Sequence, residues 1–369
     1  MGTNKTYLPP KDTKEAGEII RRCKAGESNK VLAELGYTTR KAFSIALLGN
    51  YGVRVSEICP TRERVVAESP VPEVIIKTPA IKVRKYKPSH QGKGDPETQV
   101  VLLGDHHAGE KTPTYNSSVY KKRLENIYQS TLRINDLHRH LYPIDDLVII
   151  LLGDMVHGEN PRQGAKLGAT ECGAVDQVYD LAFPELFSFM KYMRESFKTV
   201  SVYGVWGNHG RVSMESPETS NWDNMLYKAL AKSSLPDGVT MIPPTDFCQM
   251  VNINGFGFLC YHGDQIRMSN GVPYFSQRRH LKDWYFAYDG FAYACQGHFH
   301  GDDYLRISSK TKLFTNGPLV SDDPYALAKI GTSTIPSQWT FGVHNRTGVS
   351  WAYALTADQA FFPERRECK

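Results

Sequence analysis

Five short polar motifs recur along this chain, and nearly every one stands at the end of an apolar run. The motifs are Gly104-Asp105-His106-His107, Gly153-Asp154-Met155-Val156-His157, Gly207-Asn208-His209, His262-Gly263-Asp264 and Gly297-His298-Phe299-His300. The clearest apolar runs, at residues 100–103, 147–152 and 202–206, have the length of buried strands. Because strands that end in polar residues bring those residues to one rim of a sheet, the pattern predicts an α/β fold with one polar site.

The side chains of these motifs indicate metal binding. They supply carboxylates, imidazoles and one amide oxygen, and seven of the chain's 12 histidines lie in them. This combination of donors suits a hard or borderline cation such as Mn²⁺, Fe or Zn²⁺. The set is too large for one ion and has the right size for two, so we expect a dinuclear centre.

The order of the motifs resembles that of a known enzyme superfamily. Over residues 98–301, D-x-H, GD-x-x-x, GNH, H-G and GH-x-H are similar to the calcineurin-like metallophosphoesterases. The Asp-His-His-Ala-Gly opening and the GH-x-H ending are more similar to SbcD-type DNA repair nucleases and phosphodiesterases than to Ser/Thr protein phosphatases. Protein phosphatases carry acidic residues where this chain has His157 and Gly210. The chain also resembles, more loosely, phosphoesterases carried by bacteriophages.

The resemblance implies seven metal ligands on two ions: Asp105, His107 and His300 on the first, Asn208, His262 and His298 on the second, and Asp154 bridging both. A bridging carboxylate can hold two cations about 3.5–4 Å apart, the spacing used for in-line attack at phosphorus. We expect Mn²⁺ to serve best, with Fe, Zn²⁺, Mg²⁺ and Ni²⁺ as alternatives. The competing interpretation is a set of hydrogen-bonded strand ends without a metal.

Three further residues are candidates for contact with a substrate. In the family, the histidine at the position of His209 steadies the transition state or protonates the leaving oxygen; the alternative is a histidine that only supports a ligand. His157 could orient a ligand or meet a phosphate, and Arg211 could clamp one. His106 lies between two ligands on an extended segment, so it should point away from them.

The domain organisation follows from composition and patterning. We expect a small helical domain at residues 1–67, a proline-rich linker with a basic strand at 68–98, a metallophosphoesterase domain at 99–358 and a tail at 359–369. The resemblance implies that the large domain is a two-sheet α/β sandwich flanked by helices. Helical patterns fall between its strands at residues 120–141, 177–197 and 221–233.

The N-terminal region is the basic part of the chain. Residues 1–95 hold 18 Lys and Arg against 10 Asp and Glu, a net charge of +8, whereas the remainder carries −3. Helical patterns at residues 14–24, from Ser28 to Gly36, and from Thr38 or Thr39 to Gly49 resemble a helix-turn-helix. DNA is therefore the expected partner, and a small helical packing unit without nucleic acid is the alternative.

Three functions remain open at this point. The first is a metal-dependent phosphodiesterase acting as a DNA nuclease, because the basic region offers a place for a polyanion. The second is a phosphodiesterase or phosphatase for a small molecule or nucleotide, which uses the same centre. The third is a DNA-binding protein with a silent phosphoesterase fold, against which the complete ligand set argues.

The sequence also predicts where the protein works. Seven scattered cysteines without a CxxC pair, and no apolar N-terminal signal, indicate reduced thiols in the cytoplasm, or in the host cytoplasm if a phage encodes the chain. The longest apolar run, residues 147–152, is too short to cross a bilayer, so no membrane partner is expected. Homo-oligomerisation is compatible with the sequence.

Overall fold

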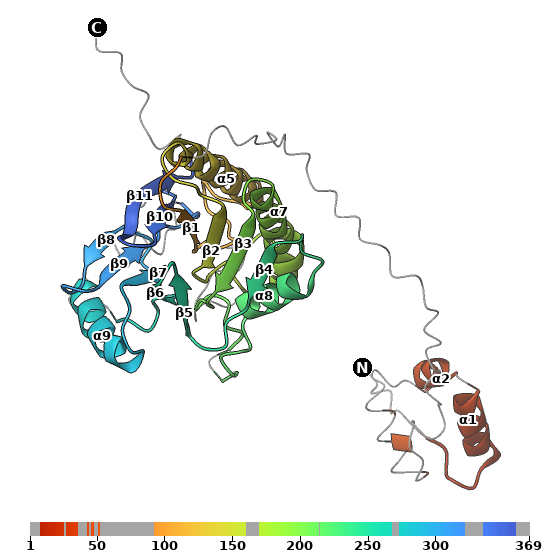
Figure 1. Ribbon diagram of the computed structural model, residues 1–369. Helices are drawn as coiled ribbons and strands as arrows, with labels where there is room; N and C mark the ends of the chain where they lie inside the picture. Colours follow the sequence, from red (N-terminus) through yellow and green to blue (C-terminus); the bar gives the residue numbers. More distant parts are fainter. Residues whose placement is uncertain are drawn as a thin grey trace. The chain divides into compact units, whose positions relative to one another are not determined.

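The computed structural model describes residues 8–25, 27–35, 43, 46–47, 51, 92–159, 170–213, 215–267, 273–321 and 335–358. The chain divides into two units, Met1–Ile75 and Ile76–Lys369, and each is described by itself. Figure 1 shows the helices and strands of both units along the sequence. In the described residues, no helix is long and apolar enough to cross a membrane.

The first unit contains two short helices, α1 (Lys14–Lys24) and α2 (Ser28–Glu34). The bounds of α1 are those predicted, and the Thr13 hydroxyl caps it by accepting from the backbone N–H of Ala16 at 3.3 Å. The second helix begins at Ser28. Glu27 precedes it, with its carboxylate 3.0 Å from the Arg22 guanidinium.

Most of the predicted third helix, the basic strand at residues 82–87 and the tail at 359–369 lie outside the described residues. Phe43 and Leu47 are described and buried, and they belong to one apolar cluster with Ala16, Cys23 and Val31 of the first two helices. The helix-turn-helix itself therefore stays a prediction.

The second unit is built on two mixed sheets. The six-stranded sheet has the order β11-β10-β1-β2-β3-β4. Its strands are β1 (Glu97–Leu103), β2 (Asp146–Leu151), β3 (Thr199–Gly204), β4 (Val239–Ile242), β10 (Ser337–His344) and β11 (Gly348–Thr356). The first four are parallel; β10 pairs antiparallel with β1, and β11 pairs antiparallel with β10.

The five-stranded sheet has the order β5-β6-β7-β9-β8. Its strands are β5 (Cys248–Ile253), β6 (Phe256–Tyr261), β7 (Tyr293–Gln296), β8 (Tyr304–Arg306) and β9 (Lys312–Thr315). The central strands β6, β7 and β9 run parallel, and the edge strands β5 and β8 pair antiparallel to them.

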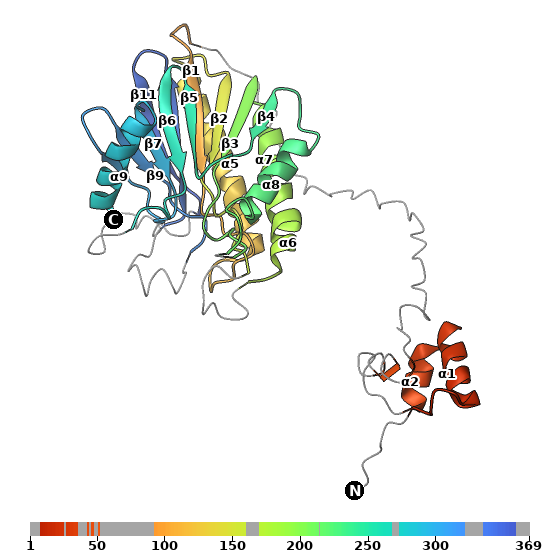
Figure 2. The same ribbon diagram turned by 90° about the horizontal axis from the view of Figure 1, so that it is seen from below.

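Helices cover the outer face of each sheet, as Figure 2 shows. Against the six-stranded sheet pack α5 (Ser117–Arg139), α6 (Ala174–Asp176) with the π-helical turn Gln177–Ala182 that continues it, α7 (Phe183–Arg194) and α8 (Trp222–Lys232). Against the five-stranded sheet packs α9 (Tyr274–Ala287). The expected two-sheet α/β sandwich flanked by helices is confirmed.

The side chains of β1 show how the layers are joined. Val101 and Leu103 pack against the helices, whereas Val100 and Leu102 pack between the two sheets. Because the side chains of a strand alternate between its faces, a strand that is apolar throughout needs a cover on both sides. This double cover explains why the apolar runs before the motifs do not alternate with polar residues.

Residues before position 99, the expected start of the metallophosphoesterase domain, already pack in the second unit. Gly92 donates its backbone N–H to the Arg139 carbonyl at 2.8 Å, and β1 begins at Glu97. The sequence did not predict helix α9 or the strands β4, β5, β8 and β10. The predicted helix at residues 221–233 matches α8, whose N-cap is Asn221.

Candidate metal centre

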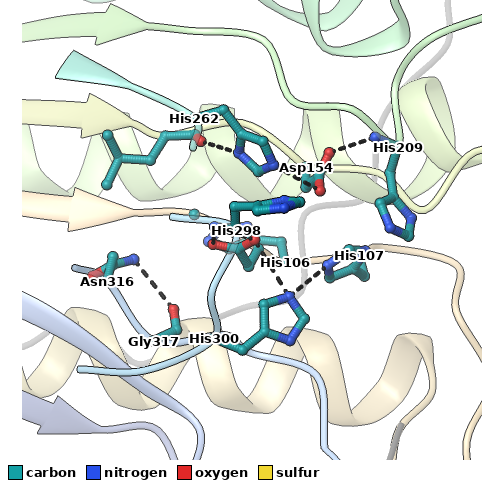
Figure 3. A network of polar contacts seen from close by, with 12 residues as sticks. His106, His107, Asp154, His209, His262, His298, His300, Asn316 and Gly317 are labelled. Atoms are coloured by element: carbon teal, nitrogen blue, oxygen red, sulfur yellow. Dashed lines mark hydrogen bonds and ion pairs between the residues drawn. The ribbon is translucent and has the colours of Figure 1, made fainter. Parts of the chain in front are cut away.

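The five motifs meet at one edge of the sandwich because each follows the carboxyl end of a parallel strand. The register aligns Leu103 of β1 with Leu151 of β2, and Leu151 with Gly204 of β3, so the loops after these strands begin at the same level. His262 follows β6, and His298 follows its parallel neighbour β7. Figure 3 shows these side chains converging from both sheets.

The first cluster of donor atoms comprises Asp105, His107 and His300, whose ligand atoms all lie within 4.8 Å of one another. His300 Nε2 is 3.3 Å from His107 Nε2 and 3.4 Å from Asp105 Oδ1. Asp105 and His107 are buried and His300 is half-buried. Two imidazole nitrogens that face each other and a carboxylate so closely fit a shared cation.

The second cluster comprises Asp154, His262 and His298, again within 4.8 Å. His262 Nδ1 lies 2.7 Å from the Leu152 carbonyl, which can only accept, so this nitrogen carries the proton. His262 Nε2 then presents its lone pair 3.0 Å from Asp154 Oδ2 and 3.1 Å from Asn208 Oδ1. A carbonyl that fixes the tautomer in this way is a common support of metal-binding histidines.

The backbone at these positions has an unusual conformation. Among the described residues, seven other than glycine have a positive φ, and five of them are Asp105, His107, Asp154, His298 and His300, at 48° to 66°. For such residues the left-handed region costs of the order of 1 kcal/mol or more and persists only where the surroundings impose it. The strain is concentrated on the residues that could bind metal.

Two glycines allow the loops to approach this closely. A Cβ added to Gly207 would overlap the Asp154 carboxylate and backbone, and one added to Gly297 would overlap the Asp105 carboxylate. Each glycine directly precedes a donor residue of its own loop. The glycines of the GNH and GH-x-H motifs therefore bring the donors of neighbouring loops into one centre.

Protonation favours metal binding at both clusters. Burial lowers the pKa of His298 to about 3, together with the neighbouring His262, and burial also holds the pKa of His107 well below its usual range. Burial alone would raise the pKa of Asp154, but His262 and His209 keep it well below the ordinary value. Neutral imidazoles beside an ionised carboxylate are the protonation states that a metal requires.

Burial would lower the pKa of His262, yet the Asp154 carboxylate raises it well above the usual range. The same competition, with Asp105 as the partner, raises the pKa of His300. Both rings lie where the structure favours a positive charge, and a divalent cation supplies that charge.

Asp223 supports this centre and was not identified from the sequence. Its buried Oδ2 accepts from the backbone N–H groups of Asp154 at 2.8 Å and Gly207 at 2.9 Å, and its Oδ1 accepts from Met155 at 3.0 Å. Burial and the Asp154 carboxylate raise its pKa to about 7, while the backbone donors act against the shift. Asp223 thus ties the loops after β2 and β3 together.

Glu110 is a second residue that the sequence did not single out. It is buried, and its Oε2 lies 3.1 Å from His157 Nδ1 and 3.9 Å from His107 Nδ1. His157, His107 and His209 form a third group with donor atoms within 4.8 Å of one another. Glu110 therefore holds His157 against the first cluster. The feature of the sequence that could have identified it is an acidic residue directly after the Asp-His-His-Ala-Gly segment.

The other predicted residues are placed as follows. His209 is half-buried, donates its backbone N–H to Asp154 Oδ1 at 2.7 Å, and has its ring centroid 4.5 Å from that of His107. The Arg211 guanidinium lies 3.6 Å from the Asp264 carboxylate. His106 is buried away from the donors, with its ring 5.6 Å from that of Tyr120.

Solved structures to which this chain is similar have low sequence identity to it. Wild-type Vps29 from Entamoeba histolytica, solved with zinc, is 12% identical, with 70% of this chain and 99% of that chain covered and a TM-score of 0.32. A conserved uncharacterized protein from Streptococcus pneumoniae, described as a predicted phosphoesterase, is 9% identical, with 71% and 99% covered and a TM-score of 0.31. A putative 5'-nucleotidase from Staphylococcus aureus is 12% identical, with 73% and 56% covered and a TM-score of 0.38.

No curated protein matches the chain. The family model for calcineurin-like phosphoesterases matches residues 98–302, which include every donor residue described above. The match spans more than half of the chain and agrees with the two clusters of Asp and His donors. The chain belongs to the calcineurin-like phosphoesterase family and is a metal-dependent phosphoesterase.

Proposed function

We propose that this protein hydrolyses phosphodiester bonds of DNA with two divalent ions, and that Mn²⁺ serves best. The observation that carries the proposal is the meeting of two Asp and His clusters, with the His209 ring beside the first of them. We assign one ion to Asp105, His107 and His300, the other to Asn208, His262 and His298, and Asp154 to both. When bound, two divalent ions would neutralise phosphate oxygens and lower the pKa of a water.

The chain's own residues supply the remaining steps. His209 is half-buried and held by its backbone bond to Asp154, so its ring can donate a proton to the leaving oxygen. His157, held by Glu110, lies beside His209 with ring centroids 5.1 Å apart and is placed to contact a phosphate. Arg211 is paired with Asp264 at 3.6 Å, so it would have to exchange that partner to clamp a phosphate.

The choice of DNA depends on the composition of the N-terminal region. Residues 1–95 carry a net charge of +8, and a basic appendage attached to a phosphodiesterase suits a polyanionic substrate. The resemblance of the motifs to those of SbcD-type nucleases, and the looser one to phage phosphoesterases, supports the same substrate. A phage origin would place the protein in the cytoplasm of the host.

A substrate panel tests the proposal. Purified protein with Mn²⁺ is offered single-stranded DNA, duplex DNA, RNA, a bis-aryl phosphate diester and an aryl phosphate monoester. We expect cleavage of DNA and of the diester, loss of both activities on chelation, and loss of both in Asp154→Asn. Asp237→Asn, at an exposed position after α8, is the matched control.

Turnover of small esters or nucleotides without cleavage of any nucleic acid would replace the nuclease by a small-molecule phosphodiesterase or phosphatase. DNA binding without any hydrolysis would indicate a DNA-binding protein whose phosphoesterase fold is catalytically inactive.

A further inference from the structure

Helix α9 has one face that packs on the protein and one that does not. Leu281 and Gln277 are buried, and Leu281 packs against Leu259 and Ala294 of the five-stranded sheet. On the opposite side, Phe275 is 67% exposed and Phe286 is 81% exposed, the highest values for large hydrophobic side chains in the described residues. Exposed aromatic rings on an ordered helix indicate an interaction surface.

The exposed residues form a continuous stripe. Phe275, Arg279, Lys282 and Phe286 follow one another at intervals of four, three and four residues, which places them within about 60° around the helix axis. Arg279 and Lys282 are exposed like the two rings. We call these four residues the α9 stripe; it places two cations between two aromatic rings over about 16 Å.

The flanks of the stripe are mainly basic. Arg278 borders one side, with its guanidinium 5.6 Å from the centre of the Tyr274 ring, and the exposed Asp283 borders the other. Three cations and one carboxylate give this face a net charge of +2. An acidic or anionic partner is therefore favoured over a purely apolar one.

The topology relates the stripe to the metal centre. Strands β6 and β7 run parallel, so α9, which connects them, runs in the opposite direction. Tyr274 and Phe275 therefore lie toward the sheet end from which His262 and His298 project, and Phe286 lies toward the other end. Figure 2 shows α9 lying along the outer face of this sheet.

We infer that the α9 stripe binds single-stranded nucleic acid, with bases stacked on Phe275 and Phe286 and phosphates at Arg279 and Lys282. Sequence-tolerant binding of single strands combines stacking platforms with cations that follow the backbone, and the stripe interleaves the two. The inference rests on the proposed function and deepens it, because a strand held along α9 leads toward the donor clusters. The stripe lies apart from every residue assigned to the ions or to proton transfer.

Binding is measured by fluorescence anisotropy of a labelled oligothymidylate with the full-length protein in chelator, so that no cleavage occurs. We expect Phe275→Ser and Phe286→Ser each to weaken binding at least about fivefold. The double variant Arg279→Ala, Lys282→Ala should reduce the slope of log K against log salt by about 1.4, since each phosphate contact on a single strand contributes about 0.7. Leu137→Ser, 58% exposed on α5, and Lys191→Ala, exposed on α7, are matched controls and should bind as wild type.

Hydrolysis of a bis-aryl phosphate diester with Mn²⁺ separates this inference from the proposed function. All stripe variants should retain wild-type turnover of the small diester, and this turnover also shows that they fold. Phe286→Ser changes the more exposed of the two rings, so it is the variant least able to disturb folding.

Oligonucleotide binding unchanged in the stripe variants, with DNA cleavage intact, would overturn the inference and leave the nuclease. Stripe-dependent binding in a protein that hydrolyses no phosphodiester would overturn the nuclease and leave the inference. If sedimentation shows a wild-type dimer that Phe286→Ser dissociates without loss of oligonucleotide binding, the stripe is a self-association surface and the inference is wrong.

Discussion

Replacing Gly207 by alanine should damage the metal centre through one added methyl group. The new Cβ would lie 2.6 Å from Asp154 Cγ and overlap the Asp154 backbone nitrogen. An ordinary contact is at least 3.4 Å, and the Asp154 backbone nitrogen would lie closer to the new Cβ than Cγ does, so the loops after β2 and β3 must separate by at least about 0.8 Å. The backbone at Gly207 does not have a positive φ, so the effect is one of contact and not of backbone conformation.

The cost follows from what holds these loops together. Asp223 Oδ2 accepts from Asp154 N at 2.8 Å and from Gly207 N at 2.9 Å, and a separation of about 0.8 Å stretches one of these bonds beyond 3.5 Å. A buried N–H without a partner costs about 1–3 kcal/mol, and the remaining overlap adds about 1 kcal/mol. We therefore expect the free energy of unfolding to fall by about 2–4 kcal/mol.

Urea unfolding in chelator measures this loss, and elemental analysis after dialysis against Mn²⁺ measures the second consequence. Because Asp154 and Asn208 lie on the separated loops, metal affinity should fall about 10–100-fold. Gly257→Ala in β6 is the matched control, since its Cβ would meet only ordinary contacts at 3.5 Å or more. A Gly207→Ala protein with the wild-type urea midpoint and full metal content would refute the reasoning.

Three further predictions concern individual groups. Asp154→Ala should lose bound metal and activity together. His209→Ala should keep its metal and lose about 10²–10⁴-fold in kcat, because His209 acts on the leaving oxygen. Equal metal loss in both variants would contradict the assignment of Asp154 as a metal ligand and His209 as a proton donor. Glu110→Gln should lower kcat about tenfold at full metal occupancy by freeing His157, and a wild-type kcat would remove Glu110 from the mechanism. Deleting residues 1–75 should weaken binding to long DNA and reduce the slope of log K against log salt by about one unit for each phosphate that this region neutralises. Turnover of an aryl diester should stay constant. Intact DNA binding with reduced turnover of the diester would instead make this region a structural support of the active site.

The sheet that carries the donors could be predicted because its information is local. The apolar runs before Asp105, Asp154 and Asn208 have strand length, and the polar residues follow immediately. The α8 helix begins after Asn221, which accepts a hydrogen bond from the Asp223 N–H at 2.8 Å, as its capping role requires. Period and capping are properties of a few neighbouring residues, so a single sequence reveals them.

The supports of the site could not be predicted, because they depend on distant contacts. Asp223 was visible only as part of a helix start, and its partner Asp154 lies 69 positions away. Helix α9 escaped detection because its buried face is narrow, and its aromatic residues lie on both sides. Neither the role of Asp223 nor the narrow buried face of α9 produces a periodic apolar pattern in the sequence.

The donors are held by the protein itself. The Asp105 carboxylate accepts from the backbone N–H of His298 at 3.0 and 3.1 Å, and that of Asp154 accepts from His209 at 2.7 Å. These bonds and the left-handed residues orient the carboxylates through the backbone, so the core beneath them sets the geometry of the donors. The five motifs therefore do more than supply donor atoms. Their glycines and backbone N–H groups fix the positions of those donors, which is the preorganisation that phosphoryl chemistry requires.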